Sequence, residues 1–265
     1  MTLTVHVQGI GVYGPGFTGW AQTAEVLAGR SAYANAPIQL PAPEALPAAE
    51  RRRAGTTIKL AFAVGFDAIR QAGADASTLR SVFSSSGGDC DICHAILETL
   101  ASTDRAVSPT RFHNSVHNAP SGYWSIATGC RATTTSLCAY DGSFAAGLLE
   151  AATQVHSAQE PCLLLTYDTP YPGPLAAPRR ISQPFGLALL LAPAAGTGTL
   201  ARLDLTLARQ APQRLDDAAL EALRMGAPAA RGLPLLQAIA RGARGQVALE
   251  YLDGMSLDVS LRPAA

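Results

Sequence analysis

The sequence has little charge and no excess of either sign. Of its 265 residues, 20 are basic and 20 are acidic, so the formal net charge is zero. Charged residues make up 15% of the chain, against about 25% in an average soluble domain. Disordered chains need high charge and few apolar groups, and proteins that bind nucleic acids through bulk charge need a basic excess. Both classes are therefore excluded.

Long apolar runs are also missing. The most apolar stretch, residues 185–192, is far shorter than the ~18 residues that a membrane-spanning helix needs. The first twelve residues lack the basic segment and apolar core of a secretory signal. The five cysteines are an odd number in a chain too large to need disulfide cross-links. We therefore expect a cytoplasmic protein with reduced thiols.

Apolar residues, in contrast, are abundant. They make up 48% of the chain, and the mean hydropathy is +0.15. A domain of this length buries about 70–75% of its unfolded surface, so a large core is possible. High apolar content with so little charge also predicts that another subunit covers part of the surface, because obligate interfaces resemble a domain core cut in half.

The spacing of apolar and turn residues predicts an α/β protein with a largely parallel sheet. Strands are expected at residues 2–12, 79–85, 133–138, 162–167, 185–191 and 200–207. Helices are expected at residues 20–28, 56–72, 90–101, 118–128, 142–158, 216–225 and 233–241. Loops are expected at 31–47, 103–117 and 171–180, and a hairpin at 246–251 and 255–261 that turns at Asp253 and Gly254.

Three early glycines have the formal spacing of a dinucleotide-binding loop. Gly9, Gly11 and Gly14 form G-x-G-x-x-G directly after the first expected strand. However, Pro15 and a second turn follow before any helix begins. No acidic residue lies about 20 positions further on, where one would bind the ribose hydroxyl. The sequence therefore favours a structural role for these glycines, and we expect no cofactor.

Two further spacings resemble haem or metal sites. Cys90, Cys93 and His94 form C-x-x-C-H, but c-type haem attachment requires export, and a zinc site would need two more ligands. His113 and His117 lie four residues apart in a segment that favours an irregular polar loop, and a third ligand is missing. Packing cysteines and hydrogen-bonded histidines are favoured, and no metal is expected. A redox dithiol at Cys90 and Cys93 stays open.

Cys130 and Cys138 are the candidate nucleophiles. Cys138 ends an expected strand just before a helix, a kind of corner at which nucleophiles occur. A catalytic cysteine also needs a base and an oxyanion hole, and His113 or His117 could supply the base. These residues by themselves indicate a cytoplasmic α/β domain with a candidate cysteine site.

Three stretches resemble the ketosynthases of the thiolase superfamily. VHVQGIGVYGPG at 5–16, followed by LAGRSA at 27–32, resembles the V-x-G-x-G-x-x-x-P start and the L-x-G-x-S helix end of that family. Residues 116–155 resemble its N-x-x-A-G-x-I-S segment, its nucleophile strand and the following helix. ISQPFGLALLLAP at 181–193 resembles a later strand that follows a gating turn.

The resemblance implies an α/β, thiolase-like fold with αβαβα layers, of which residues 1–195 form the N-terminal half. Residues 196–265 would complete the same domain as a short strand, helix and hairpin segment. In that family a cysteine at the strand end is the nucleophile. Counting without gaps from Gly129 places Asp141 there, and Cys138 falls three residues earlier.

Two catalytic elements of that family are therefore missing. A carboxylate at the strand end can cap the helix that follows, but it cannot form a stable thioester. A full ketosynthase also has two catalytic histidines in its C-terminal half, whereas no histidine follows His156 in this sequence.

The resemblance thus implies a non-catalytic subunit, similar to the chain length factors of type II polyketide systems. It is closer still to the truncated ketosynthase-like subunits of bacterial aryl polyene clusters. Such a subunit pairs with a full-length ketosynthase, stabilises the heterodimer and shapes the end of the acyl tunnel, and an acyl carrier protein reaches it through the complex. Residues 110–124 would lie at the dimer face, where the candidate partner-facing and tunnel-lining residues are Phe112, His113, Ser115, Val116, His117 and Trp124.

Two alternatives stay open. A stand-alone cysteine-dependent acyltransferase or β-ketoacyl synthase would use Cys138 or Cys130, with a histidine of the 113–117 segment as its base. A small-molecule-binding or redox protein would use the glycines of residues 9–14 or the C-x-x-C motif.

Overall fold

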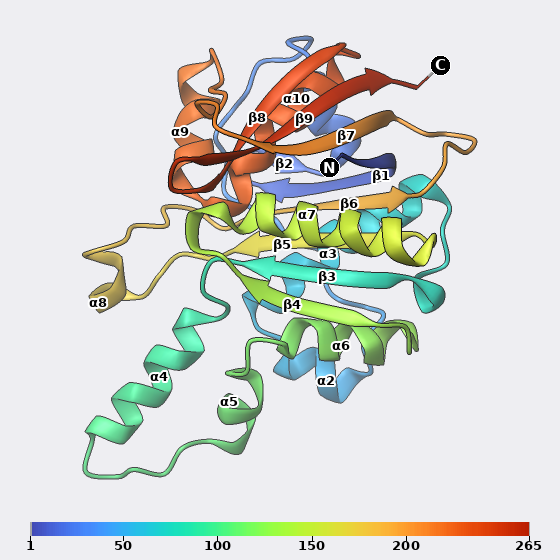
Figure 1. Cartoon of the computed structure of the whole chain (residues 1–265). Helices are drawn as coiled ribbons and strands as arrows, with labels where there is room; N and C mark the ends of the chain where they lie inside the picture. The colour runs from blue at the N-terminus through green and yellow to red at the C-terminus, as the bar shows by residue number, and fades with distance from the viewer. Residues whose placement is uncertain (1, 265) are drawn as a thin grey trace.

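One mixed sheet runs through the molecule and carries helices on both faces (Figure 1). The computed structural model describes residues 2–264. The strand order in that part of the chain is β4-β3-β5-β6-β1-β7-β9-β8, and β2 pairs with β1. The strands are β1 Leu3–Gly14, β2 Phe17–Thr18, β3 Arg80–Ser85, β4 Thr134–Cys138, β5 Cys162–Asp168, β6 Phe185–Ala192, β7 Ala201–Ala208, β8 Gly245–Leu252 and β9 Met255–Pro263.

Along the chain, the helices alternate with these strands in short groups. They are α1 Trp20–Leu27, α2 Ala48–Arg53, α3 Thr56–Ala72, α4 Cys90–Ala101, α5 Pro109–Asn114, α6 Ala119–Thr128, α7 Ser143–Ala158, α8 Gly173–Ala176, α9 Ala218–Gly226 and α10 Leu233–Ala240. Short 3-10 turns are η1 Ala76–Thr78, η2 Tyr140–Gly142 and η3 Pro228–Gly232. Among residues 2–264, no helix has both the length and the apolar character needed to cross a membrane.

Every expected strand and helix is confirmed to within two residues at each end, and α3 has the expected bounds. The expected loop at 103–117 is wrong in part, because α5 lies inside it. Its start carries local signals, since Ser108 caps the helix and Pro109 occupies its first position. The helix α2 begins directly after Pro47 and was also not expected.

The sheet is mixed, so the expectation of a largely parallel sheet is wrong. Only β3 runs parallel to its neighbours β4 and β5, and the other pairs are antiparallel. The expectation rested on the order of strands and helices along the chain. The strands β5 and β6, whose residues are buried throughout, carry no polar alternation that would have corrected it. Helices cover both faces here, and that burial makes antiparallel strands as uniformly apolar as parallel ones.

Two cores lie on opposite faces of the sheet. On one face, α3 packs against β1, β6 and β5, together with Tyr123 and Trp124 of α6. On the other face, α7 packs against β3, β5 and β1, and residues of α1, α9, η3 and α10 complete the same core. The strands β7, β9 and β8 continue the sheet beyond β1 and turn their apolar side chains toward this second core.

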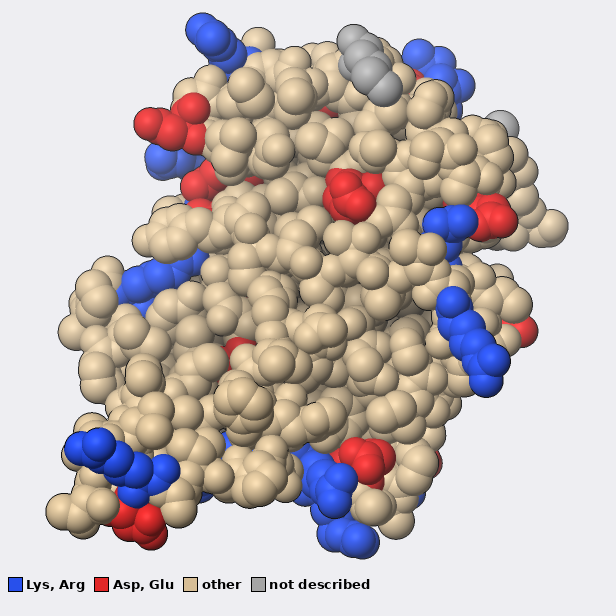
Figure 2. Space-filling view, turned by 60° about the horizontal axis from the view of Figure 1, so that its bottom comes forward, with Lys and Arg blue, Asp and Glu red and all other residues tan. Residues whose placement is uncertain are grey.

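The two edges of the sheet differ. At β8, the backbone N–H of Gln213 donates a 2.9 Å hydrogen bond to the carbonyl oxygen of Ala248, so the segment before α9 covers part of that edge. At the opposite edge, β4 pairs with β3, and within residues 2–264 no other strand pairs with it. Figure 2, which brings the side with β4 and α6 forward, shows charged side chains mainly at the margins of this face.

The early glycines are explained by the packing of α3 on β1. A Cβ atom at Gly9 would overlap the carbonyl group of Ala68, and one at Gly11 would overlap the carbonyl group of Val64. These positions need glycine because the backbone of α3 lies directly against the strand. The G-x-G-x-x-G spacing thus has a structural cause.

A buried carboxylate ties the ends of two strands to η3. Asp168 ends β5 and accepts hydrogen bonds from the backbone N–H of Ser86, the hydroxyl of Ser86 and the backbone N–H of Ala229, at 2.6–2.8 Å. Burial nevertheless raises the pKa of Asp168 from 3.8 to about 6, against the opposing effect of these bonds.

The substitution Gly11→Ala should lower the free energy of unfolding by about 1–3 kcal/mol, because the added methyl group must displace the backbone of α3. Gly122→Ala is the matched control. Gly122 lies in α6, where an added Cβ meets open space, so the helix should gain about 0.5–1 kcal/mol. Urea denaturation of both variants measures the difference, and equal stabilities would contradict this account of the motif.

The raised pKa of Asp168 predicts a pH-dependent stability. As the pH rises from about 4 to 6, the unfolded chain loses this proton first, so the free energy of unfolding should fall by about 3 kcal/mol in total. Asp168→Asn cannot titrate there, so the wild type should lose stability relative to this variant over that range. Urea denaturation at several pH values tests this, and a constant difference between the two proteins would contradict it.

Candidate functional site

The candidate site lies where β4 turns through η2 into α7. Tyr140 adopts a left-handed backbone conformation there, with φ of 51°, which costs a residue other than glycine about 1–2 kcal/mol. The hydroxyl of Ser143 fixes this corner. It lies 2.7 Å from the carbonyl oxygen of Tyr140 and 3.0 Å from that of Ser85, and it accepts a hydrogen bond from the N–H of Ala139. Sharp strand-to-helix corners of this kind present nucleophiles in several enzyme folds.

An arginine occupies the space beside this corner. Nη2 of Arg179, from the segment between β5 and β6, lies 2.8 Å from Oδ1 of Asp141. The guanidinium carbon of Arg179 also lies 3.3 Å from the centroid of the Tyr140 ring, in cation–π contact. The residue expected at the nucleophile position, Asp141, is thus held in an ion pair, and the corner carries a tyrosine, a carboxylate and a guanidinium.

His117 and Cys138 lie in direct contact. Nε2 of His117 is 2.6 Å from Sγ of Cys138, which ends β4. Burial lowers the pKa of His117, and burial also raises the pKa of Cys138, so both shifts favour the neutral imidazole and the neutral thiol. The Nδ1 atom of His117 is buried without a hydrogen-bond partner among residues 2–264. The pair has the contact that a cysteine nucleophile needs, but its thiol is not activated as a thiolate.

The remaining histidine and cysteine candidates lie apart from this pair. His113 is exposed and packs beside Tyr123, with ring centroids 6.3 Å apart. Cys130 is buried, and its sulfur lies 3.3 Å from the carbonyl oxygen of Leu79.

The C-x-x-C motif begins α4, whose first turn is capped by the Asp89 side chain. Burial raises the pKa of both Cys90 and Cys93, which disfavours reactive thiolates. His94 lies 3.3 Å from Glu98 on the next turn of the helix. Within the described residues, no three side chains of the metal-binding types come together.

The residues expected to face a partner fall into two groups. Phe112 is 66% exposed, Val116 is also exposed, and Ser115 is partly exposed beside them. Trp124 is 1% exposed and lies inside the core, where its ring contacts those of Phe62, Phe66 and Phe83 at centroid distances of 4.7–6.4 Å. The structure therefore places Trp124 in the interior of this chain and not on its surface.

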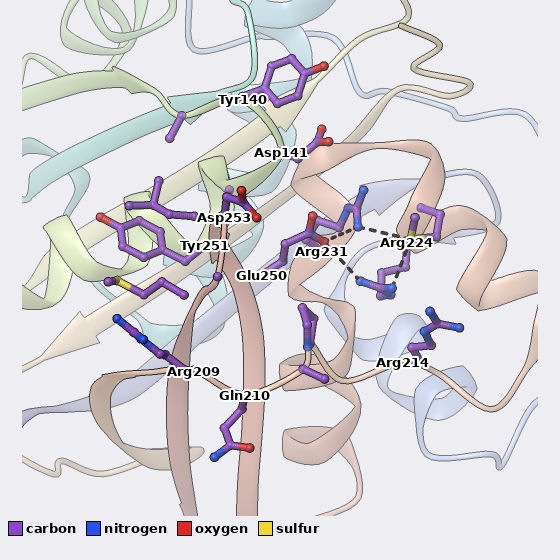
Figure 3. A pocket seen from close by; sticks show the side chains of 18 residues that line it. Tyr140, Asp141, Arg209, Gln210, Arg214, Arg224, Arg231, Glu250, Tyr251 and Asp253 are labelled. Carbon is purple, nitrogen blue, oxygen red and sulfur yellow. Dashed lines mark hydrogen bonds and ion pairs between the residues drawn. The ribbon is translucent and has the colours of Figure 1, made fainter.

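A cleft of about 890 Å³ opens on the other side of the corner, between η2 and the turn of the β8–β9 hairpin (Figure 3). Arg231 pairs with Glu250, and Arg224 donates two hydrogen bonds of 2.7 Å to Glu221. The bonds from Arg224 lower the pKa of Glu221 to about 2. Arg224 also lies 4.0 Å from Glu250, so that α9 and η3 both pair with β8.

The C-terminal hairpin also closes directly on the corner. A Cβ atom at Gly142 would overlap the carbonyl group of Tyr251. Sequence reasoning missed this contact, the Arg179–Asp141 pair and the strained backbone of Tyr140. The two contacts join segments far apart in the chain, and the sequence around Arg179 shows only a proline-rich loop. The positive φ of Tyr140 falls on a residue other than glycine, so no local signal marks it.

Several solved structures share this fold over nearly the whole chain. One is a complex of the ketosynthase ApeO with its chain length factor ApeC from Xenorhabdus doucetiae, with a TM-score of 0.74, 23% identity, and coverage of 97% of this chain and 99% of the other. The ishigamide ketosynthase/chain length factor has a TM-score of 0.74 and 14% identity, and the coverage is 99% and 100%. AntDE:AntF, a type II acyl carrier protein in complex with its ketosynthase, has a TM-score of 0.74 and 12% identity, with full coverage of both chains.

No curated protein sequence matches the chain. A family model does, and it covers residues 20–250, a range that includes the corner at η2 and most of the residues that line the cleft. The chain therefore belongs to the family of β-ketoacyl synthase N-terminal domains.

Proposed function

We propose that this chain is a non-catalytic, chain-length-factor-like subunit that pairs with a full-length β-ketoacyl synthase. The observation that carries the proposal is the open outer edge of β4, which no other strand of residues 2–264 pairs with. An unpaired edge presents backbone N–H and C=O groups to another chain, and proteins usually cover such an edge. The opposite edge is partly covered by Gln213.

Exposed apolar side chains surround this edge. We call them the partner face: Leu97 and Leu100 of α4, Phe112 of α5, Val116 of the turn between α5 and α6, and Ile126 of α6. Each is at least 47% exposed, and Figure 1 shows α4, α5 and α6 on the same side of the molecule as β4. Single exposed apolar residues are common, but a group beside an open edge marks an interaction site.

The helix α4 supports the same interpretation. None of its twelve residues is buried by the described part of the chain, and the helix projects from the body of the molecule (Figure 1). Isolated helices of this length are marginal in water, and most helices in proteins are stabilised by packing of an apolar face. A second subunit would supply that packing.

The kind of partner follows from the similar structures. Two of them are complexes of a ketosynthase with a chain length factor, and a third contains a ketosynthase with its acyl carrier protein. A full-length ketosynthase is therefore the partner that we propose, with an acyl carrier protein reached through the complex in the cytoplasm.

The role that we propose for the partner face is control of product length. In the heterodimer, Phe112, Ser115 and Val116 would face the end of the ketosynthase acyl tunnel, with His113 and His117 beside them. The depth of that tunnel sets the point at which a further unit clashes, which is a discrimination by shape. Trp124 would support this surface from within. Catalysis by this chain is not expected, because Asp141 is paired with Arg179 and no histidine follows His156.

The His117–Cys138 contact favours one second candidate, a stand-alone acyltransferase in which Cys138 is acylated. The 2.6 Å approach of Nε2 to Sγ is the geometry of such a dyad. The pKa shifts of both residues oppose it, because they favour the neutral pair. We therefore rank it second.

Charge at the partner face should prevent the proposed pairing. The chain, co-expressed with the proteins encoded by its genomic neighbours, should be recovered with a full-length ketosynthase near one-to-one by affinity purification and mass spectrometry. Phe112→Glu and Ile126→Glu should each abolish this recovery while the melting temperature stays unchanged, since both side chains are exposed. Met225→Glu, at an equally exposed position on α9, is the control. Recovery of the chain only with itself would refute the proposal.

The two candidate functions differ in their need for Cys138. With a non-catalytic subunit, Cys138→Ala should leave the elongation rate of the complex within about twofold, a change of about 0.4 kcal/mol in the barrier. The isolated wild-type chain, mixed with an acyl thioester, should gain no acyl mass. Cys93→Ala serves as the control thiol variant. An acyl adduct that disappears in Cys138→Ala would establish the acyltransferase instead.

A further inference from the structure

Tyr140 is an exposed aromatic residue on a strained backbone. Its φ is 51° and its side chain is among the most exposed large apolar groups of the molecule, at 62%. Only one other residue besides glycine, Gln159, has a positive φ within residues 2–264. Buried tyrosines such as Tyr123 and Tyr167 contribute to the core. The ring of Tyr140 is mostly exposed, so its burial does little to offset the backbone strain at this residue.

Arg179 holds this ring in place. The guanidinium carbon lies 3.3 Å from the ring centroid on one side, and the Asp141 carboxylate anchors the same guanidinium at 2.8 Å. Two further nitrogens of Arg179, Nε and Nη1, are buried without a hydrogen-bond partner in the described chain. Buried donors without partners destabilise a fold. The arrangement therefore presents the ring at a cost to the stability of this chain.

Strained residues that persist in a fold occur mainly at functional sites. Tyr140 follows Cys138 by two residues, so it stands at the end of the open edge of β4. Tyrosine and arginine are the residue types most enriched, with tryptophan, among the side chains that dominate binding energy at interfaces. Figure 3 shows the ring at the margin of the cleft, pointing away from Glu250 and Arg231. The ring is therefore directed outward and not toward a ligand bound inside the cleft.

We propose that Tyr140 is a principal contact residue for the ketosynthase partner and that Arg179 and Asp141 are the positioning residues that present it. This inference rests on the proposed function and deepens it, because it names a side chain at the end of β4 that the partner would bind. The partner surface that fits is an apolar recess with a hydrogen-bond acceptor or donor for the phenol hydroxyl.

Tyr140→Gly tests the inference directly, because glycine adopts a positive φ without strain. The variant should melt at the same or a higher temperature than the wild type, yet bind the ketosynthase at least about tenfold more weakly. Gln159→Gly is the matched control. It relieves the strain of a residue with a φ of 56° at the other end of α7 and leaves the proposed interface intact. Its affinity should stay within about twofold of the wild type.

The dissociation constants of the full-length chains, measured by biolayer interferometry, separate the outcomes. A Tyr140→Gly variant that binds as tightly as the wild type would overturn the inference while the proposed function stands. Failure of the wild-type chain to bind any ketosynthase would instead overturn the proposed function. Should Tyr140→Gly not fold, Arg179→Met keeps the tyrosine and removes its support. A several-fold weaker affinity is then expected, and an unchanged affinity overturns the inference.

Discussion

The burial of α7 is the constraint on which the rest of the structure depends. Its inner face carries small residues such as Ala145, Gly147 and Ala151, so the helix lies close against β3 and β5. A helix that is apolar over so much of its surface must be covered on its outer side as well. The C-terminal segment does this with η3 and β8, and the carbonyl group of Tyr251 packs directly on Gly142. The β8 edge of the sheet is partly covered by Gln213, whereas β4 pairs with no second strand among residues 2–264.

The C-terminal elements that cover α7 also limit the chemistry available at the turn from β4 through η2 into α7. Ion pairs of Arg224 and Arg231 with Glu221 and Glu250 join the C-terminal elements around the cleft. Arg179 fills the remaining space beside Tyr140 and Asp141. A carboxylate whose oxygen is engaged by a guanidinium is a poor nucleophile toward a thioester. The corner residues are thus engaged with one another, while the His117–Cys138 pair lies to one side at the open edge.

Local signals in the sequence predict the helices and strands well. The sequence does not reveal the contacts between segments that lie far apart in the chain. The helix α3 has the expected bounds because its apolar period is regular and Gly73 ends it in the left-handed conformation. The sheet direction was wrong because burial on both faces removes the alternation that distinguishes antiparallel strands. The resemblance implied a place for Trp124 at the dimer face, but α6 turns its ring toward Phe66 of α3. The partner of Asp141 comes from 38 residues further along the chain, beyond the reach of any motif.

The open edge and the projecting helix must be satisfied by the same partner. An edge strand needs another strand, whereas α4 and the other exposed apolar side chains of the partner face need an apolar surface. A flexible peptide could add a strand but could not cover α4. A helical protein could cover α4 but could not pair with β4. A second protein with a sheet edge flanked by helices offers both at once, and a ketosynthase of the same layered fold is such a protein. Since the face carries few charges (Figure 2), recognition would depend on shape and apolar contact, as in interfaces between permanent partners.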